Sequence, residues 1–497
     1  MARIGLTELD GRDFDVVVIG AGATGASAAQ HLAAAGYGVL VVDKADFASG
    51  ASSRSGRLLH CGLRFLEPGE GLGYRSPSIW DSLRHPREFA RNLRRARDAM
   101  GCRAQFVATM PERVSAFTFC LPLWREGPYR PWQAALGLRL LGALGPREPP
   151  LEALRLTPGE IAQNPLFRAL RDPERLAAAF TFREYRFEWP ERIVLDTLLD
   201  ARRMGALARN YTPALAIERD RADGWRVTLG DAFETGARAS VTARLVLNNA
   251  GAWTDRVSRL ASEGAARRIQ GTKGTHIMVR LPPGCAAYGI LSHNSRREPY
   301  YLIPWRGLHY VGPTDTPYEG DIDDVRATED EIEGLIAETN GLLPGLGLER
   351  ADVLFSWAGV RPLTYDPEKS MGVRGYVFHD LGRDGLDGMF AMTSSPLLSH
   401  RLAGRRLARE VARRLSPSGR PKELSYAAKP FHEAGASPAL LNHWPEAKLA
   451  HLSHTAAEED PVTLADLLFR RVGAGWTETM GREGARLAAE TVSDAMG

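Results

Sequence analysis

The chain has 497 residues, of which 44% are hydrophobic and 25% are charged. These values are ordinary for a globular protein and exclude collagen-like, coiled-coil and largely disordered chains. Its 63 basic and 60 acidic residues give a formal net charge of +3, so overall charge indicates no nucleic-acid partner. At roughly 100–200 residues per domain, the length predicts two to four domains. No apolar run of about 18 residues occurs, so no transmembrane helix is expected.

The N-terminal residues and the cysteines indicate in which cellular compartment the protein is expected. The opening residues lack the basic-then-apolar layout of a secretory signal. The four cysteines show no CxxC spacing, so reduced thiols in a cytoplasmic protein are expected. Neither HExxH nor GxSxG occurs, so nothing supports a zinc protease or a serine hydrolase, and no metal site is predicted.

The opening segment predicts a strand, a turn, a helix and a second strand. Residues 14–19 are a short β-branched run, typical of a strand buried on both faces of a parallel sheet. Residues 26–35 are Ala-rich and end at Gly36, a helix stop signal. A second buried strand over 39–42 closes at Asp43.

Between the first strand and the helix stand Gly20, Gly22 and Gly25, with the spacing GxGxxG. The first glycine permits a tight turn, and the second lets the backbone approach a pyrophosphate at the helix N-terminus. The third permits close packing of the helix on the strand. Asp43, at the end of the second strand, is placed to accept a ribose hydroxyl. The motif predicts a dinucleotide site and does not by itself distinguish NAD from FAD.

Further along, the chain alternates between helical and strand-like pieces. Residues 132–141 predict an apolar helix that either lies at a membrane interface or packs on the protein. Alternating segments between about 265 and 380 predict an antiparallel sheet. Other expected elements are strands at 214–217, 225–229 and 244–247, a helix at 402–415, a linker at 416–421 and mostly helical structure to 497.

Several polar residues are candidates for a site, and each has a plainer alternative. Ser52 and Ser53 either bond phosphate or flavin edges or stand in a solvated loop. The turn at 249–251 either passes close to a ligand or is only a turn. His276 is interpreted as part of a Gly-flanked basic loop before a strand. Arg361 is interpreted as following a strand, where it binds a carboxylate or phosphate or makes a surface salt bridge.

Five segments of the chain carry a family resemblance. They are FDVVVIGAGATG at 14–25, SSRSGRLLHCGLRFLE at 52–67, GTKGTHIMV at 271–279, YLIPWRGLHYVGPTDTPYEGD at 301–321 and WAGVRPL at 357–363. Together they resemble the FAD-dependent glycerol-3-phosphate dehydrogenases, within the flavin amine and alcohol oxidoreductases. The resemblance covers roughly residues 14–411, and the tail at 463–476 looks like the family's C-terminal helical domain in reduced form. It implies FAD rather than NAD.

The resemblance also implies an α/β fold with three parts. These are a Rossmann-like FAD-binding domain at 1–75, 185–262 and 385–412, a substrate domain with an antiparallel sheet at 76–184 and 263–384, and a helical C-terminal region at 413–497.

The same resemblance assigns roles by position. Residues implied at the cofactor are Gly20, Gly22, Gly25 and Asp43 around its ADP part, Ser52, Ser53, His60, Cys61 and Gly62 along the flavin, and Asn249, Ala250, Gly251, Ser394, Ser395, Pro396 and Leu397 nearby. Residues implied around the substrate are Arg64, His276, Arg361 and Arg374. The implied reaction oxidises the secondary alcohol of a polyol phosphate, with hydride passing to flavin N5. His276 is the candidate base, with Arg361 as an alternative that positions the alkoxide, and arginines grip the phosphate.

This sequence departs from the family at two polar positions. Where the family has a Gly-Gly-Lys run, the chain has Ser394-Ser395-Pro396, so a cation and an N–H donor are lost. Phe65 stands where the family has a tyrosine, so a hydroxyl is lost as well. These losses indicate a substrate that is larger than glycerol 3-phosphate or less dependent on phosphate. His400 is the local candidate to replace the lysine.

Three function classes follow. The first is an FAD-dependent dehydrogenase of a small anionic, hydroxylated molecule, and the second is a flavin oxidase of an alcohol or amine that uses O2. The third, a flavin-binding protein without catalysis, is suggested by Pro396 and opposed by the retained Arg64, His276 and Arg361. The acceptor is expected to be quinone or O2, because no second Rossmann motif occurs. Quinone reduction implies peripheral contact with the inner face of the membrane, and a homodimer is compatible with the resemblance.

Overall fold

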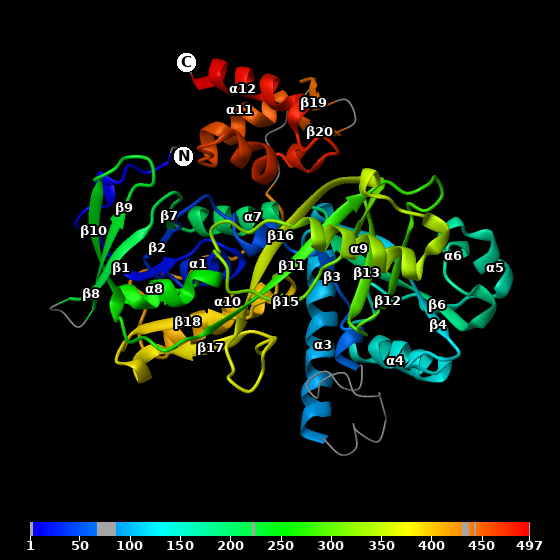
Figure 1. Cartoon of the computed structure of the whole chain (residues 1–497). Coiled ribbons are helices and arrows are strands. Elements are labelled where there is room, and N and C mark those ends of the chain that lie inside the picture. Colours follow the sequence, from blue (N-terminus) through cyan, green and yellow to red (C-terminus); the bar gives the residue numbers. More distant parts are fainter. Residues whose placement is uncertain (1–2, 67–85, 221–223, 430–436, 442–443, 497) are drawn as a thin grey trace.

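Two large β-sheets lie side by side in the computed structural model. The C-terminal region, orange to red in Figure 1, packs against Trp305 of the second sheet and bonds Trp189. The structure describes residues 3–66, 86–220, 224–429, 437–441 and 444–496. Glu67, which ends one of the segments above, and the expected domain boundary at 75/76 lie outside the described residues. The two-sheet α/β architecture confirms the predicted fold class, and the domain boundaries stay a prediction.

The first sheet is parallel at its centre, where its strands are apolar on both faces. There β1 (Asp13–Ile19) pairs in parallel with β10 (Arg238–Asn248) and β2 (Val39–Val42). The order is β17-β18-β10-β1-β2-β7, and β9 and β8 add an antiparallel ribbon beside β10. The remaining bounds are β7 Leu207–Arg209, β8 Ala214–Arg219, β9 Trp225–Gly230, β17 Val377–Asp380 and β18 Met389–Thr393. The strands predicted at 14–19, 39–42, 214–217, 225–229 and 244–247 are confirmed.

One face of this sheet is covered by α1 (Ala23–Ala34), α7 (Pro190–Arg203) and α10 (His400–Ala412). The Ala-rich helix begins three residues earlier than predicted, so its N-terminus faces the Gly-rich turn directly. The helix predicted at 402–415 is confirmed as α10. The other face packs against β8, β9 and α8 (Thr254–Ala261).

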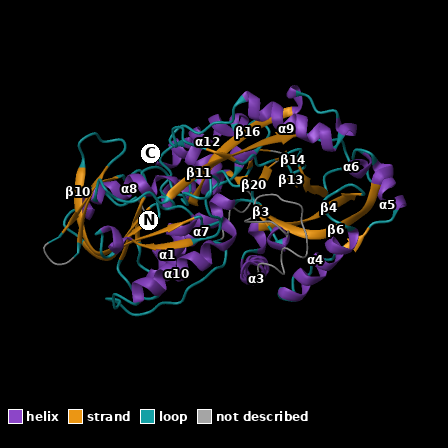
Figure 2. Ribbon diagram, turned by 60° about the horizontal axis from the view of Figure 1, so that its bottom comes forward, coloured by secondary structure: helices purple, strands orange, loops and turns teal. Residues whose placement is uncertain are grey.

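The second sheet is mostly antiparallel, as predicted, with the order β15-β11-β14-β13-β12-β4-β6-β3, and β16 pairs with β11. Figure 2 shows its long strands β4 and β6 curving around the apolar interior. Its strands are β3 Leu58–Leu59, β4 Val114–Trp124, β5 Leu154–Arg155, β6 Leu176–Phe187, β11 Ile269–Val279, β12 Tyr288–His293, β13 Pro299–Trp305, β14 Leu308–Val311, β15 Thr316–Pro317 and β16 Val353–Thr364.

Two predictions about local structure in this sheet are wrong. The segment Gly271–His276 is not a loop, because it lies inside β11, where every residue is buried. Its basic residue is neutralised internally, since Lys273 pairs with Glu331 at 2.8 Å. Arg361 does not follow a strand but lies inside β16. The glycines that indicated loops serve close packing instead: a Cβ on Gly274 would overlap the Arg361 guanidinium.

The apolar helix predicted at 132–141 is α4 (Pro131–Leu144). Leu138 and Leu141 are buried in the apolar cluster under the second sheet, whereas Trp132 and Leu136 are 55% and 51% exposed. The helix therefore packs by one side and presents apolar side chains on the other. Within the described ranges, no helix is long and apolar enough to cross a membrane. Other helices are α3 Pro86–Thr109, α5 Pro158–Gln163, α6 Pro165–Arg168 and α9 Glu329–Leu342.

The C-terminal region is helical only in part. Helices α11 (Leu449–Glu458) and α12 (Arg482–Met496) and a π-helical turn at Asp466–Arg471 share a small apolar cluster. A hairpin of β19 (Ala439–Leu441) and β20 (Trp444–Lys448) corrects the prediction of mostly helical structure. Strands this short carry too little alternation to be read from sequence.

We expect Gly404→Ala to destabilise the fold, because a Cβ there would lie 2.6 Å from the backbone of Ser27 in α1. Overpacking of this kind costs about 1–3 kcal/mol. Gly334→Ala is the control, since Gly334 is exposed in α9 and a Cβ there meets nothing within 4 Å. Alanine should then raise the unfolding free energy by up to ~1 kcal/mol. Thermal unfolding measures both, and equal midpoints would contradict the close packing of α10 on α1.

Candidate active site

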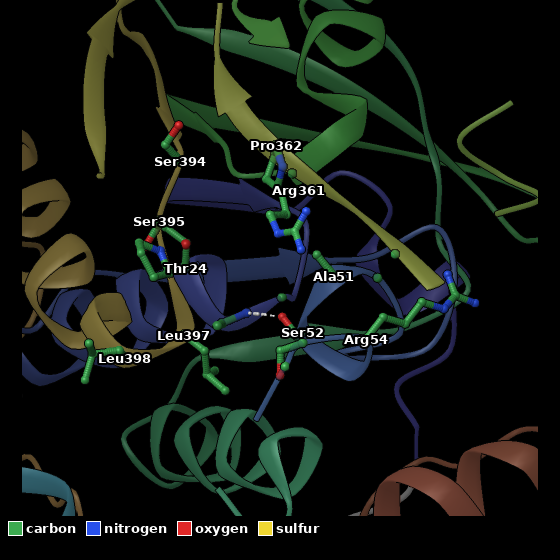
Figure 3. Close-up of a pocket in the computed structure, with 18 of the residues that line it drawn as sticks. Thr24, Ala51, Ser52, Arg54, Arg361, Pro362, Ser394, Ser395, Leu397 and Leu398 are labelled. Atoms are coloured by element: carbon green, nitrogen blue, oxygen red, sulfur yellow. Dashed lines mark hydrogen bonds between the residues drawn. The ribbon is translucent and has the colours of Figure 1, made fainter. Parts of the chain in front are cut away.

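A cavity of about 1000 Å³ lies between the two sheets, at the upper end of the roughly 300–1,000 Å³ typical of ligand sites. Its wall comes from both sheets and from the segments that follow β1, β2, β10 and β18. Ligands of open α/β sheets bind at this edge, where strand order reverses on the two sides of the first strand. Figure 3 shows part of the lining.

The Gly-rich turn is built by close approaches. Gly20 has φ +103°, and a Cβ on it would lie 2.5 Å from the Asn249 carbonyl oxygen. A Cβ on Gly25 would overlap the Gly20 carbonyl, so α1 packs directly on the turn. Gly22 has an ordinary φ of −75°, and a Cβ there would meet Ser52 Oγ at 3.3 Å. Gly20 and Gly22 line the cavity, whereas Gly25 stands behind its wall.

Asp43 lines the cavity at the end of β2. Its carboxylate accepts hydrogen bonds from the Ala21 N–H at 2.7 Å and the Ala45 N–H at 3.0 Å. Burial raises the pKa of Asp43 to about 6, the nearby Asp46 adds to the rise, and the two hydrogen bonds oppose it. The carboxylate is thus fixed beside the Gly-rich turn with lone pairs left to accept a hydroxyl.

The segment after β2 folds back over the start of α1. Ser52 Oγ accepts a hydrogen bond from the Ala23 N–H at 3.0 Å, drawn as the dashed line in Figure 3. Ser53 turns the other way: its buried hydroxyl donates to the Ala48 carbonyl at 2.5 Å, and it does not line the cavity. Ser52 therefore stands at a helix N-terminus whose own N-cap, Gly22, offers no side chain.

Arg361 and Arg374 line another part of the wall and meet at the carboxylate of Asp315. Arg361 donates to Asp315 Oδ1 at 3.0 Å and to the Thr314 carbonyl at 3.1 Å, and Arg374 pairs with Asp315 Oδ2. Burial lowers the pKa of Arg361 to about 10, with Asp315 opposing and the charges of Arg374 and Arg64 contributing. In Figure 3 the Arg361 guanidinium points into the cavity. Guanidinium groups placed in this way on the wall suit an anion.

His276 is buried and lines the same cavity. Its ring stacks on Trp357, with centroids 4.7 Å apart and an interplanar angle of 9°. Neither ring nitrogen has a hydrogen-bond partner in the part of the chain that the structure describes. Burial, helped by the charges of Arg361 and Arg57, holds the pKa of His276 well below its ordinary value of 6.5. The imidazole is therefore neutral at pH 7 and able to accept a proton.

The segment around His60 reaches the cavity from the second sheet. Burial and the charge of Arg64 lower the pKa of His60 to about 4. The Cys61 N–H donates to Glu184 at 2.8 Å, and burial raises the pKa of Glu184 to about 7. Gly62, with φ +90°, abuts α3 and does not line the cavity.

The segment after β18 forms a further part of the wall. The Ser394 hydroxyl bonds to neighbouring backbone, and Ser395, Pro396 and Leu397 line the cavity. His400 does not take the place of the missing lysine: it is buried outside the lining, with Nδ1 2.6 Å from the Leu397 carbonyl.

The second sheet also contributes an apolar wall. The lining side chains there are Phe119, Phe182, Leu291, Tyr301 and Ile303, with Leu63 and Phe65 beside them. Aromatic and aliphatic surfaces of this kind cover the faces of planar rings well.

The cavity brings together most of the residues that the sequence singled out. Those that line it are Gly20, Gly22, Asp43, Ser52, His60, Cys61, Arg64, Asn249, Ala250, Gly251, His276, Arg361, Arg374, Ser394, Ser395, Pro396 and Leu397, and those behind it are Gly25, Ser53 and Gly62. Sequence reasoning missed Asp315, although it lies in a segment that carries the resemblance. Its pairing with two arginines depends on tertiary packing, which no spacing reveals. Among the described side chains, no group of three or more His, Cys, Asp and Glu could hold a metal ion.

Comparison with known proteins gives the family. The family model described as FAD dependent oxidoreductase matches residues 15–410. The chain belongs to this family. A glycerol-3-phosphate dehydrogenase from a Synechocystis strain is 31% identical over 426 residues, covering 83% of this chain and 72% of that protein. The D-erythritol 1-phosphate dehydrogenase of Brucella abortus is 33% identical over 384 residues, covering 75% and 68%. These relatives confirm the resemblance found in the sequence.

Solved structures show the same fold. The FAD complex of glycerol-3-phosphate dehydrogenase from Bacillus halodurans aligns with a TM-score of 0.69 at 21% identity, covering 98% of this chain and 92% of that one. The FAD-bound L-alpha-glycerophosphate oxidase of Mycoplasma pneumoniae aligns with a TM-score of 0.61 at 16% identity, covering 85% and 100%. As in this family, the cofactor of the chain is FAD.

The cavity fits an FAD-type ligand on its own evidence. The side-chain nitrogen and oxygen of Asn249, Ser395 Oγ and His60 Nδ1 are buried and lack partners among the described residues. All three residues line the cavity. Buried polar groups normally have hydrogen-bond partners. A ligand with polar groups along its length would provide those partners here.

We expect Gly22→Ala to weaken FAD binding by at least about tenfold, or ~1.4 kcal/mol, because the methyl group occupies the approach to a pyrophosphate. The FAD-free protein should lose no more than about 1 kcal/mol of stability, since inside the protein the Cβ meets Ser52 Oγ at 3.3 Å. Gly142→Ala is the control, exposed in α4 with nothing within 4 Å. Fluorescence titration of the FAD-free proteins gives the constants. Unchanged affinity for Gly22→Ala would contradict the assignment of this turn.

Proposed function

We propose that the chain is an FAD-dependent dehydrogenase that oxidises a secondary alcohol of a small, anionic, polyol-like substrate to a ketone. The observation that carries the proposal is the placement of Arg64, Arg361, Arg374 and neutral His276 on the wall of the cavity that the Gly-rich turn borders. The names of the Synechocystis and Brucella relatives support a phosphorylated polyol as the substrate class.

We assign the two ends of the cavity to different parts of the cofactor. Gly20, Gly22 and Asp43 hold the ADP part at the start of α1. Ser52 and Ser395 bond along the cofactor toward the reactive end, and the apolar wall of the second sheet covers the ring system. Bound FAD supplies the acceptor for the substrate hydride.

The arginines bind and orient the substrate in this proposal. Guanidinium forks suit phosphate or carboxylate oxygens because they offer paired N–H donors. Asp315 touches neither substrate nor cofactor here; it holds Arg361 and Arg374 by one oxygen each and so fixes the distance between them. Asp315 is therefore a positioning residue.

His276 takes the hydroxyl proton in this proposal. Its ring nitrogens have no partner among described groups and its neutral form prevails at pH 7, so an unprotonated base is ready before substrate binds. Arg361, close enough for its charge to affect His276, favours the alkoxide that forms as the proton leaves.

Two apolar replacements bear on substrate size. Pro396 and Phe65 line the cavity at the positions where the glycerol-3-phosphate dehydrogenases that the sequence resembles have a lysine and a tyrosine. At these two positions the wall therefore offers neither a cation nor a hydroxyl group. We infer that Arg64, Arg361 and Arg374 bind the anion without help from a lysine. We also infer that the space left by the lysine and the hydroxyl admits a polyol longer than glycerol. A four-carbon polyol phosphate should accordingly be used at least as well as glycerol 3-phosphate.

The electron acceptor in this proposal is quinone or O2. The exposed Trp132 and Leu136 on α4 favour quinone, because apolar side chains beside Arg139 suit contact with a membrane surface. The rate at which the reduced flavin is reoxidised by air, measured in the next experiment, distinguishes the two acceptors.

The test of the proposal is anaerobic reduction of the bound flavin by a substrate panel. We expect erythritol phosphate and glycerol 3-phosphate to bleach the flavin, and free polyols, hydroxy acids and amines to fail at equal concentration. Admitting air should restore colour slowly for a dehydrogenase and rapidly for an oxidase. Bleaching by an amine alone would contradict the proposed reaction, and a flavin-loaded protein that nothing bleaches would favour loss of catalysis.

The pH dependence of kcat tests the role of His276. Because its pKa is held well below 6.5, the ring stays neutral as pH falls to about 6.5, and activity should fall only at lower pH, where the ring is protonated. His276→Gln should lower kcat by about 10²–10⁴-fold. His309→Gln is the control, since His309 is equally buried on β14 but does not line the cavity. An acid limb centred above pH 6.5 would contradict the assignment.

A further inference from the structure

The cavity wall is held from behind by the C-terminal region. Residues 43–45, 49–52 and 54–57 line the cavity, so the 43–57 loop forms much of the wall beside the Gly-rich turn. We propose that the C-terminal region positions this loop for FAD binding through two buried contacts, one at Asp46 and one at Arg57. The inference rests on the proposed placement of FAD.

The first contact is a buried ion pair at Asp46. Arg471 makes a bidentate pair with its carboxylate, at 2.7 Å and 2.8 Å, and Arg470 donates to the same carboxylate at 2.5 Å. Asp46 and Arg471 have no exposed side-chain surface. Although burial opposes it, the two arginines lower the pKa of Asp46 to about 2. The pair is therefore charged throughout the physiological range.

The two arginines reach Asp46 from an unusual turn. Arg470 and Arg471 end the π-helical segment Asp466–Arg471, and Arg470 also pairs with Asp466 inside that turn. π-Helical turns are rare and are found frequently at functional sites. In this turn adjacent arginines both bond one carboxylate of the loop.

The second contact closes the other end of the loop. The Arg57 guanidinium lies between two indole rings, 4.2 Å from the Trp305 centroid and 4.3 Å from the Trp476 centroid. Its Nη2 donates to Glu191 at 3.1 Å, and both side chains are fully buried. Trp305 belongs to the second sheet and Trp476 to the C-terminal region, so Arg57 joins the loop to both.

The contacts act on the cavity through the loop, and Trp476 also packs against Trp357, whose ring stacks on His276. Arg470, Arg471 and Trp476 do not line the cavity, so they are positioning residues. The loop passes their effect to the Gly-rich turn, because the Ala48 N–H donates to the Ala21 carbonyl at 3.1 Å and Ser52 Oγ accepts from Ala23.

The same region docks elsewhere through a contact that avoids the loop. Arg192 of α7 makes a buried bidentate pair with Glu459, at 2.6 Å and 2.8 Å. Arg192 does not line the cavity. Its Nη1 also lies 3.5 Å from the Arg471 carbonyl, but it bonds neither Asp46 nor Arg57. Arg192→Met is therefore the control in which docking is weakened and both side-chain partners of the loop are kept.

The test compares FAD affinity and thermal stability in the full-length protein and the variants Arg471→Met, Trp476→Leu and Arg192→Met. We expect all three variants to lower the unfolding midpoint. The FAD dissociation constant should rise at least tenfold in Arg471→Met and Trp476→Leu and stay within twofold of wild type in Arg192→Met. The visible flavin spectrum should shift in the first two variants only.

Two results would overturn the inference. One is an FAD dissociation constant within twofold of wild type in both loop-contact variants, which leaves the region a purely stabilising role. The other is an equal rise in Arg192→Met, which makes docking in general the cause. If Arg471→Met fails to fold, Trp476→Leu and Arg470→Gln decide by the same criteria. Failure of the wild type to bind FAD would instead refute the proposed function.

Discussion

The close approach of the chain at Gly20 is the constraint on which the site depends. Parallel pairing of β1 with β10 ends both strands at one edge of the sheet, so the Gly-rich turn meets the turn at Asn249 with no room for a side chain between them. A residue with a Cβ at position 20 would push the two turns apart. It would also strain the positive-φ backbone there and displace the start of α1. The cavity, the fixed carboxylate of Asp43 and the Ser52 contact all follow from that edge.

Charge in this protein is organised locally. The whole chain has a net charge of only +3, yet Arg64, Arg361 and Arg374 all line the cavity, where the latter two share the carboxylate of Asp315. Burial keeps His276 neutral, with the charges of Arg361 and Arg57 contributing, and the guanidinium groups of the same wall suit an anionic substrate. One arrangement thus supports both substrate binding and proton removal in the proposed reaction.

The sequence revealed the parts of the fold whose signals are local. The β-branched runs, the Gly spacing and the Ala-rich helix predict β1, α1 and β2 correctly, and the quoted segments predict the family. It misassigned Gly271–His276 and Arg361 because their glycines lie inside strands, where they permit close packing rather than turns. It missed Asp315 and the contacts at Asp46 and Arg57, because these join residues distant in sequence. Such contacts are fixed by tertiary packing, which one sequence does not display.

The measurement that tests the account most directly is a crystal structure of the protein with FAD and a polyol phosphate. We expect the pyrophosphate at the Gly20–Gly22 turn, the flavin ring against the apolar wall of the second sheet, and the phosphate of the substrate on Arg361 and Arg374. The substrate hydroxyl should lie within hydrogen-bond reach of His276. FAD bound elsewhere, or a substrate phosphate away from the arginines, would contradict the account.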